Sequence, residues 1–205
     1  MKIFGLTGNM ATGKTTLAKI LHQKKIPVFE ADKQVKFLQN QSQAIRTLLA
    51  EKGLVADADK PIPSKEMREL ILKSPHLLKE LEAIYHPAVH ILEKKFIRQA
   101  YRQRRKVIFL DIPLLFEVAE YQACFDAVFL SYVPSSIQKQ RAFKRKNMTA
   151  EWFSFIDSRQ LPSKWKMKYS QAVITTGLTL RDSRWRFLSK LKAFLSHKPS
   201  YQKHP

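Results

Sequence analysis

One stretch constrains the fold of this chain more than any other. Residues 8–15 read Gly8-Asn9-Met10-Ala11-Thr12-Gly13-Lys14-Thr15 and match the phosphate-loop pattern G-x-x-x-x-G-K-[ST]. The apolar run at 2–7 predicts a buried strand before the loop. The residues after the loop predict a helix over 13–24, with apolar residues at the spacing of one helix face: Leu17, Ile20 and Leu21. A strand, a glycine-bounded turn and a helix are the context in which this pattern binds phosphate.

The chemistry of such a loop indicates a bound triphosphate. Glycine lets the backbone turn tightly enough to aim successive N–H groups at an anion. The N-terminus of the following helix adds partial positive charge, which also favours phosphate. Lys14 would reach the β- and γ-phosphates, and the Thr15 hydroxyl would ligate Mg²⁺.

The rest of the chain predicts four more strands, separated by helical segments. They span 26–29, 106–111, 126–132 and 172–175. Within the strand predicted at 106–111, residues 107–110 are all apolar, which is typical of a central parallel strand covered on both faces. This order of elements predicts an α/β fold with a five-stranded parallel sheet. A final helix over 182–196 is expected to pack on the sheet through one apolar side, formed by Trp185, Leu188, Leu191 and Leu195.

Two aspartates follow predicted strands, Asp32 after the second and Asp111 after the third. Because ligands of open α/β sheets gather at the carboxyl ends of strands, we expect both acids at the edge that carries the phosphate loop. Asp32 would orient a substrate hydroxyl or accept its proton; an equally supported alternative is a cap on the next helix. Asp111 is placed as a Walker B-type acid that holds Mg²⁺ directly or through water, again with a helix cap as the alternative.

Residues 34–105 carry little strand pattern and predict several consecutive helices. The expected helices span roughly 33–39, 42–51, 64–72, 75–85 and 87–104. Five helices are too many for a simple crossover, so we expect an inserted helical subdomain over 33–105 that holds the second substrate. His86 and Pro87 fall at an expected helix start, where a lone histidine is more often a cap or a packed side chain than a catalyst.

A strongly basic segment over 137–168 separates the last two strands. Its positive side chains are Lys139, Arg141, Lys144, Arg145, Lys146, Arg159, Lys164, Lys166 and Lys168. Arg141 and Arg145 are four residues apart and would share a helix face, from which a mobile lid would bring both to a bound triphosphate. The alternative is contact with RNA or DNA, using nearby aromatic residues as stacking platforms. We favour an anchoring role for these aromatic residues, which are Trp152, Phe153 and Phe155.

Composition indicates the general class and the cellular compartment of the protein more than its function. A hydrophobic content of 44% over 205 residues indicates a globular chain, and no apolar stretch approaches the ~20 residues of a membrane span. The start shows no signal-peptide pattern, and the single Cys124 excludes an internal disulfide, so we expect a cytoplasmic protein. The net charge of +20 predicts attraction to polyanions without choosing among them. Residues 197–205 predict a frayed basic tail.

In order along the chain, these motifs resemble those of the dephospho-coenzyme A kinase family over about residues 1–180. The resemblance rests on Gly5-Leu6-Thr7-Gly8 leading into Gly13-Lys14-Thr15-Thr16, on Ala31-Asp32-Lys33 and on His86-Pro87. It continues through Asp111-Ile112-Pro113-Leu114-Leu115-Phe116-Glu117, the arginines Arg141 and Arg145, and Gln160-Leu161-Pro162. The phosphate loop alone would fit many families, whereas the combination in this order is specific.

The resemblance implies a three-layer P-loop NTPase fold with core segments 1–32, 106–136 and 169–196, an acceptor-binding insertion and a mobile lid. It implies that ATP, with Mg²⁺, phosphorylates the 3′-hydroxyl of the ribose of dephospho-coenzyme A. Asp32 would engage that hydroxyl, while Lys14 and Arg141 would stabilise the transferring phosphoryl group. The implied ATP-binding residues are Gly8, Asn9, Met10, Ala11, Thr12, Gly13, Lys14, Thr15, Thr16, Arg141 and Arg145; those for the acceptor are Thr7, Asp32, Lys33, His86, Pro113 and Leu114; those for Mg²⁺ are Thr15 and Asp111.

The chain departs from the family in three places. Residues 8–12 replace the usual Gly-Gly-Ile-Gly-Ser run, which we expect phosphate binding to survive if the backbone φ angles stay negative. Lys146 follows the second lid arginine, where aspartate is usual. Near the last strand, Ser170-Gln171 and Thr175-Thr176 replace the usual Ala-Asp and Asp-Asn, a change that bears on base specificity.

Two alternatives remain beside this interpretation. One is a nucleoside or nucleotide kinase of the same fold, against which Asp32-Lys33 and Pro113-Leu114-Leu115 argue. The other is a basic nucleic-acid-binding P-loop protein, which the net charge would suit. For the favoured interpretation we expect ATP and dephospho-coenzyme A as partners. We expect no specific nucleic acid, no membrane, and a monomer or weak homo-oligomer.

Overall fold

A computed structural model describes residues 1–51, 53, 55, 64–118 and 125–196 of the chain. Cys124 and the predicted tail at 197–205 lie outside the described residues. The chain divides into two compact units, of which the first contains Met1–Phe29 and Gln99–Pro205 and the second Glu30–Arg98. None of the helices in the described ranges combines the length and the apolar character of a membrane span.

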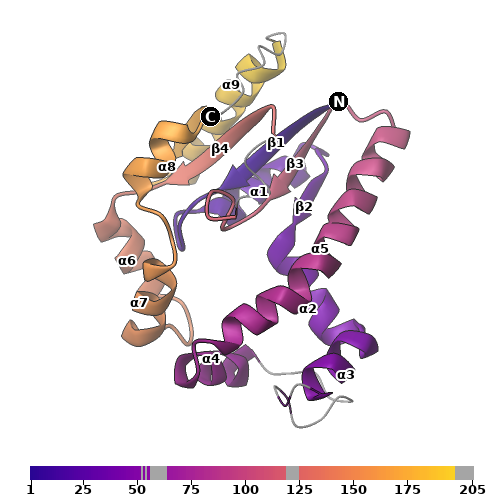
Figure 1. Cartoon of the computed structure of the whole chain (residues 1–205). Helices are drawn as coiled ribbons and strands as arrows, with labels where there is room; N and C mark the ends of the chain where they lie inside the picture. Colours follow the sequence, from indigo (N-terminus) through magenta and orange to yellow (C-terminus); the bar gives the residue numbers. More distant parts are fainter. Residues whose placement is uncertain (52, 54, 56–63, 119–124, 197–205) are drawn as a thin grey trace. The chain divides into compact units, whose positions relative to one another are not determined.

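The first unit is built on a five-stranded parallel sheet with the strand order β2-β3-β1-β4-β5 (Figure 1). The strands are β1 (Lys2–Thr7), β2 (Val28–Glu30), β3 (Val107–Asp111), β4 (Ala127–Tyr132) and β5 (Ala172–Thr175). β1 lies in the centre, with Leu6 opposite Asp111 of β3 and Thr7 opposite Leu130 of β4. This sheet confirms the predicted fold class and brings the ends of β1, β3 and β4 to one edge.

Several helices belong wholly to the first unit. They are α1 (Lys14–Gln23), α6 (Ser135–Phe143), α7 (Ala150–Ser158), α8 (Ser163–Tyr169) and α9 (Leu180–Ser196). α1 carries its buried residues at the predicted helical spacing, and both α1 and α9 contribute side chains to the core cluster of the sheet. α6, α7 and α8 occupy the basic segment between β4 and β5.

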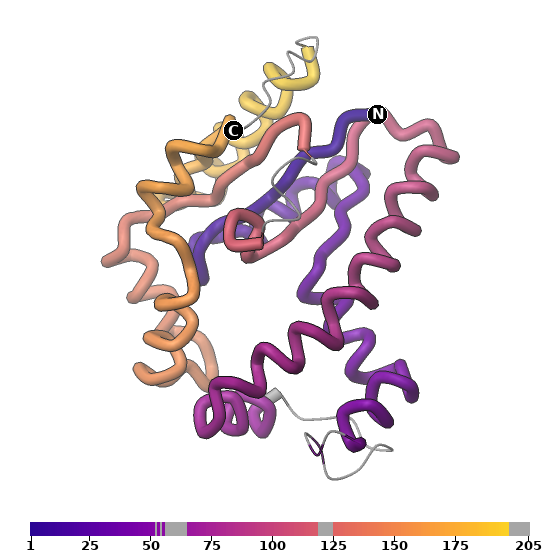
Figure 2. Tube along the Cα trace, viewed as in Figure 1, coloured from indigo at the N-terminus to yellow at the C-terminus, as the bar shows by residue number. Residues whose placement is uncertain are grey.

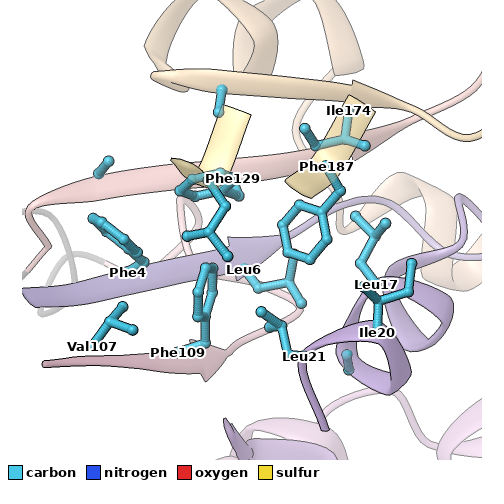
Figure 3. Packing of buried hydrophobic residues seen from close by; sticks show 14 residues of the cluster. Phe4, Leu6, Leu17, Ile20, Leu21, Val107, Phe109, Phe129, Ile174 and Phe187 are labelled. Carbon is cyan, nitrogen blue, oxygen red and sulfur yellow. The ribbon is translucent and has the colours of Figure 1, made fainter. Parts of the chain in front are cut away.

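Phenylalanines from three neighbouring strands form the centre of the core (Figure 3). Phe4, Phe109 and Phe129 are at most 1% exposed, and the ring centroids of each pair lie 5.4 Å apart. Their rings are tilted or edge-on to one another, the arrangement that aromatic pairs prefer. Leu17 of α1 and Phe187 of α9 belong to the same cluster. The packing therefore fixes β1 and α1, the two elements that flank the phosphate loop.

The second unit is helical. Its helices are α2 (Ala31–Gln41), α3 (Gln43–Glu51), α4 (Ser64–Lys73) and the greater part of α5 (Leu77–Arg102). The prediction of two helices over 75–85 and 87–104 is wrong, because α5 continues through Pro87. His86 and Pro87 lie on its exposed side, while Ile84 and Val89 on either side of them are buried. Burial of a continuous apolar face outweighs the one backbone hydrogen bond that proline removes.

α9 begins at Leu180, two residues before its expected start. Thr179 and Asp182 form a capping box, in which the Asp182 N–H donates to Thr179 Oγ1 at 3.1 Å and the Thr179 N–H to Asp182 Oδ2 at 3.3 Å. Hydrogen bonds from Thr179 also lower the pKa of the Asp182 carboxyl group. The reciprocal bonds satisfy N–H groups of the first turn and fix the start of the helix.

The apolar side predicted for α9 is wrong in part. Leu191 is buried and Leu188 packs against the core, as expected. Trp185 and Leu195, in contrast, are exposed. The buried face is rotated because Phe187 enters the aromatic cluster of the sheet, where its ring centroid lies 5.7 Å from that of Phe129.

Candidate active site

The phosphate loop passes from β1 into α1 through three residues with positive φ. The angle is 152° at Gly8, 61° at Ala11 and 97° at Gly13. A Cβ on Gly8 would lie 2.1 Å from Ser131 Oγ, so both the backbone angle and the packing require glycine there. The expectation of negative φ angles in the substituted loop is wrong at Ala11, which takes the left-handed conformation despite its side chain. The loop thus adopts a left-handed conformation at a position that carries a side chain.

Buried hydroxyl groups set the shape of the loop. Thr12 Oγ1 donates a hydrogen bond to the Asn9 carbonyl at 2.7 Å and lies 2.7 Å from Ser131 Oγ at the end of β4. Ser131 Oγ is also 3.2 Å from the carbonyl of Thr7, the last residue of β1. These contacts lie within the protein, so the loop is shaped before a ligand arrives. A preorganised loop avoids reorganisation when charge develops on a phosphate.

Lys14 and Asp111 meet at the carboxyl edge of the sheet. Lys14 is the first residue of α1, and its Nζ forms an ion pair with Asp111 Oδ1 at the end of β3. Asp111 is 4% exposed, whereas Thr15, which follows Lys14, is exposed. The structure therefore joins a cation, a carboxylate and a neighbouring hydroxyl at the helix N-terminus, a set that suits a phosphate and its metal ion.

A tight turn follows β3 directly (Figure 2). Thr7 Oγ1 donates a hydrogen bond to the carbonyl of Pro113 in this turn at 3.0 Å. Leu115 is buried against β1, where a Cβ on Gly5 would lie 2.7 Å from Leu115 Cδ1. Leu114, between these two residues, is half-buried. The contacts bring Thr7, Pro113 and the phosphate loop to the same end of β1.

Glu117 ties this turn to the segment between α7 and α8. Its Oε1 accepts a hydrogen bond from the Leu161 N–H at 2.8 Å and lies 2.7 Å from Lys166 Nζ. The Lys166 side chain is fully buried, and this burial lowers the pKa of its ammonium group, although Glu117 opposes the shift. The ion pair is therefore buried, and removal of either charged group would leave the other charge buried without compensation.

We expect Lys166→Met to lower the free energy of unfolding by about 3 kcal/mol, because it leaves the buried Glu117 carboxylate without its cation. Urea denaturation measures the loss. Lys164→Met is the matched control, since Lys164 lies on the same helix but is exposed. The double variant with Glu117→Gln should recover part of the loss. Equal stability of the Lys166 and Lys164 variants would contradict the prediction.

Burial of the Lys166 ammonium group makes stability depend on pH in the alkaline range. Because burial lowers the pKa of Lys166 below its ordinary 10.5, the folded chain binds fewer protons here than the unfolded chain. The contribution of Lys166 to the free energy of unfolding therefore rises as pH rises from the lowered pKa toward 10.5. The difference between the wild type and Lys166→Met should show this rise.

Arg141 lies on α6 and bonds to Thr176, just after β5. Its Nη2 donates to the Thr176 carbonyl at 2.8 Å, and its Nη1 lies 3.4 Å from Thr176 Oγ1. Arg145 is exposed and lies beyond the end of α6 at Phe143. The prediction that the two arginines share a helix face is therefore wrong. The helix ends in a turn in which the Arg145 N–H donates to the Ala142 carbonyl, so only Arg141 is carried by α6.

The basic segment also contacts the phosphate loop directly. Gln160, after α7, accepts a hydrogen bond from the Met10 N–H at 3.0 Å. Ala11 packs in a buried cluster with Ala142 of α6 and Phe153 of α7. Phe153 thus anchors the segment as predicted. The other two aromatic residues, Trp152 and Phe155, stack on each other with their ring centroids 5.5 Å apart.

The remaining candidate residues belong to the second unit. Asp32 is exposed in the first turn of α2, and Lys33 beside it pairs with Glu30 at 2.7 Å. The N-cap of α2 is Glu30, so the alternative role of Asp32 as the cap is wrong. His86 is exposed in the interior of α5 instead of at a helix start. The structure places Asp32 and Lys33 in one turn, and His86 on another helix of the same unit.

Sequence reasoning missed Ser131 as a residue that shapes the site, and it noted Thr176 only as part of a change that bears on base specificity. Both stand at or just after the carboxyl end of a buried strand, β4 for Ser131 and β5 for Thr176. Both contact the phosphate loop, through Thr12. Asp111 was found by that rule of position, and extending the rule to hydroxyl groups would have found these two residues as well.

These features define a P-loop kinase: a parallel five-stranded sheet, a phosphate loop between β1 and α1, and a lysine paired with a strand-end aspartate. The sequence profile described as dephospho-CoA kinase matches residues 2–182. The chain belongs to the dephospho-CoA kinase family.

Relatives and solved structures agree with this assignment. The dephospho-CoA kinase of Bartonella henselae is 36% identical over 197 residues, which cover 96% of this chain and 100% of that protein. Protein TT1252 of Thermus thermophilus has a similar structure, with a TM-score of 0.77, 25% identity, and coverage of 96% of this chain and 98% of that one. The dephospho-CoA kinase of Campylobacter jejuni shares the fold at a TM-score of 0.61 and 22% identity, over 94% of this chain and 97% of its own.

Proposed function

We propose that this chain transfers the γ-phosphoryl group of ATP to the 3′-hydroxyl of the ribose of dephospho-coenzyme A. The observation that carries the proposal is the pairing of Lys14 with Asp111 beside a phosphate loop that is shaped by the buried hydroxyl groups of Thr12 and Ser131. Membership of the family supports ATP as the donor, and the names of the relatives support the acceptor.

The phosphate loop and two cations would hold the donor. Gly8 to Thr16 would surround the phosphates with backbone N–H groups at the N-terminus of α1. Lys14 would exchange part of its contact with Asp111 for the β- and γ-phosphate oxygens. Arg141, which already lies beside the loop through Thr176, would neutralise charge on the transferring group, and Arg145 would follow from the exposed turn after α6.

Mg²⁺ fits the donor set that the chain offers. Nucleotide-bound Mg²⁺ takes only one or two protein ligands and keeps several waters and phosphate oxygens. The Thr15 hydroxyl and the Asp111 carboxylate, on adjoining elements of the first unit, match this requirement. When bound, Mg²⁺ neutralises charge on the β- and γ-phosphates. Asp111 meanwhile keeps Lys14 oriented toward the same group.

Asp32 would act on the acceptor. It would accept the proton of the ribose 3′-hydroxyl as the oxygen bonds to the γ-phosphorus and the bond to the bridging oxygen of ADP breaks. Its exposed place in the first turn of α2 leaves it accessible to a substrate. Thr7, Lys33, His86, Pro113 and Leu114 are the further acceptor-binding residues that the family resemblance implies, and we include them in the proposal.

The experiment that tests the proposal is a coupled assay of ADP formation with the purified chain, ATP, Mg²⁺ and dephospho-coenzyme A. We expect turnover that depends on the acceptor, and phosphate at the 3′-oxygen of the product. Adenosine in place of the acceptor tests the nucleoside kinase alternative. Salt-sensitive binding of DNA or RNA without turnover would favour the nucleic-acid alternative instead.

We propose that one chain carries out this reaction. A monomer or a weak homo-oligomer is compatible with this proposal. The cytoplasm is the proposed compartment, since a protein with the single Cys124 needs no oxidising environment for its folding. The excess of basic residues would serve two polyanionic substrates without requiring nucleic acid.

A further inference from the structure

We infer that Thr176 is a positioning residue, which holds the lid arginine Arg141 and the phosphate loop in one fixed arrangement. Thr176 bonds to both of them at once, and it is 4% exposed. The inference rests on the proposed function, in which Arg141 stabilises the transferring phosphoryl group. It adds a residue on which that role of Arg141 depends.

The hydroxyl of Thr176 has the capacity for two different bonds. Its single hydrogen is donated to the carbonyl of Thr12 in the phosphate loop. Its lone pairs remain available to Arg141 Nη1 at 3.4 Å. The carbonyl of the same residue accepts from Arg141 Nη2 at 2.8 Å. Two nitrogens of one planar guanidinium group therefore meet two oxygens of one residue, which fixes the orientation of the group as well as its distance.

Thr176 is itself held by the sheet. Its N–H donates to the carbonyl of Tyr132, the last residue of β4, at 3.0 Å. On the loop side, a Cβ on Gly13 would lie 2.8 Å from Thr176 Oγ1 and 3.2 Å from Thr176 Cβ. The absence of a side chain at Gly13 thus permits the loop to approach Thr176 this closely. Because β4 holds Thr176 in place, and Thr176 bonds to Arg141 of α6 and to the loop, the sheet fixes the positions of both.

This arrangement predicts which kinetic quantity Thr176 controls. A guanidinium group that is held in place loses less freedom when it meets the charge that develops during transfer. Removal of the hydroxyl should therefore lower kcat and leave the KM for dephospho-coenzyme A unchanged, because that substrate does not contact Thr176 in the proposed site. If Thr176 only filled space, its replacement would change the stability of the protein without selectively lowering kcat.

The test compares Thr176→Ala with Thr176→Ser, which differ from each other by the hydroxyl alone. We expect Thr176→Ala to lower kcat about tenfold and Thr176→Ser to keep it within about threefold of the wild type. Ser189→Ala is the control for the loss of a hydroxyl group, because Ser189 is exposed on α9 and lies outside the proposed site, and it should leave kcat unchanged. Equal kcat values for the alanine and serine variants would overturn the inference.

A double-mutant cycle with Arg141→Met shows whether Thr176 acts through Arg141. In the Arg141→Met background, Thr176→Ala should lower kcat less than about twofold; a full tenfold loss there would overturn the inference. The wild type, the two single variants and the double variant are also titrated with the non-hydrolysable ATP analogue AMP-PNP. We expect the double variant to lose less binding free energy than the sum of the losses of the two single variants. If the wild type fails to turn over dephospho-coenzyme A, the proposed function fails while the affinity cycle still decides the inference. Additive losses of affinity would overturn it in that case as well.

Discussion

Lys14→Ala will transfer the phosphoryl group at least about 100-fold more slowly than the wild type, which is the size of effect expected when one preorganised charge is removed from the developing negative charge. Lys14 stands at the N-terminus of α1, where the loop delivers the phosphates, and its ion pair with Asp111 fixes the direction of its side chain. The loss should appear mainly in kcat, because the backbone N–H groups of the loop still bind the nucleotide.

The same substitution leaves the buried Asp111 carboxylate without its cation, so a lower rate has to be separated from a lower stability. Thermal unfolding curves show whether the variant is still folded at the assay temperature, which separates the two effects. Lys19→Ala is the matched control, because Lys19 is exposed on the same helix and lies outside the proposed site. A folded Lys14→Ala protein with an unchanged rate would remove the phosphate loop from the proposed chemistry.

The parallel sheet was predictable because its strands are short, apolar and buried. A run such as that of β3 is compatible with little else than a central strand, and the observed bounds differ from the expected ones by two residues or fewer at either end. Helix ends were less predictable, since they depend on single hydrogen bonds. The start of α9 is set by Thr179 and Asp182, and α5 continues past Pro87 because tertiary packing on both sides of it is favourable.

The candidate site divides in a similar way. Lys14 and Asp111 were predictable as neighbours, because both follow from the rule that parallel strands end at one edge. The left-handed angle at Ala11 and the fork between Arg141 and Thr176 were not, since they depend on residues brought together only by the folded chain. The end of α6 before Arg145 is another example, because a pattern of four-residue spacing carries no information on where the helix stops.

Asp32→Asn is expected to lower kcat about 1000-fold, because the amide cannot accept the proton of the attacking hydroxyl, and general base catalysis contributes factors of this order. The affinity for AMP-PNP should stay within about twofold of the wild type, since Asp32 is proposed to act on the acceptor hydroxyl and is not among the residues proposed to bind the donor. Rates and affinities come from the coupled assay and from calorimetric titration of the same preparation.

The fold should survive this change, since Asp32 is exposed and the N-cap of α2 is Glu30, so only a favourable charge near the helix N-terminus is removed. Glu80→Gln provides the matched control: Glu80 is an exposed acid in the first turn of α5, in the same unit. If both variants turned over at the wild-type rate, the acceptor hydroxyl would have to be engaged by another group. This result would contradict the proposed contact between the ribose hydroxyl and the Asp32 carboxylate, but it would leave the proposed role of the phosphate loop unchanged.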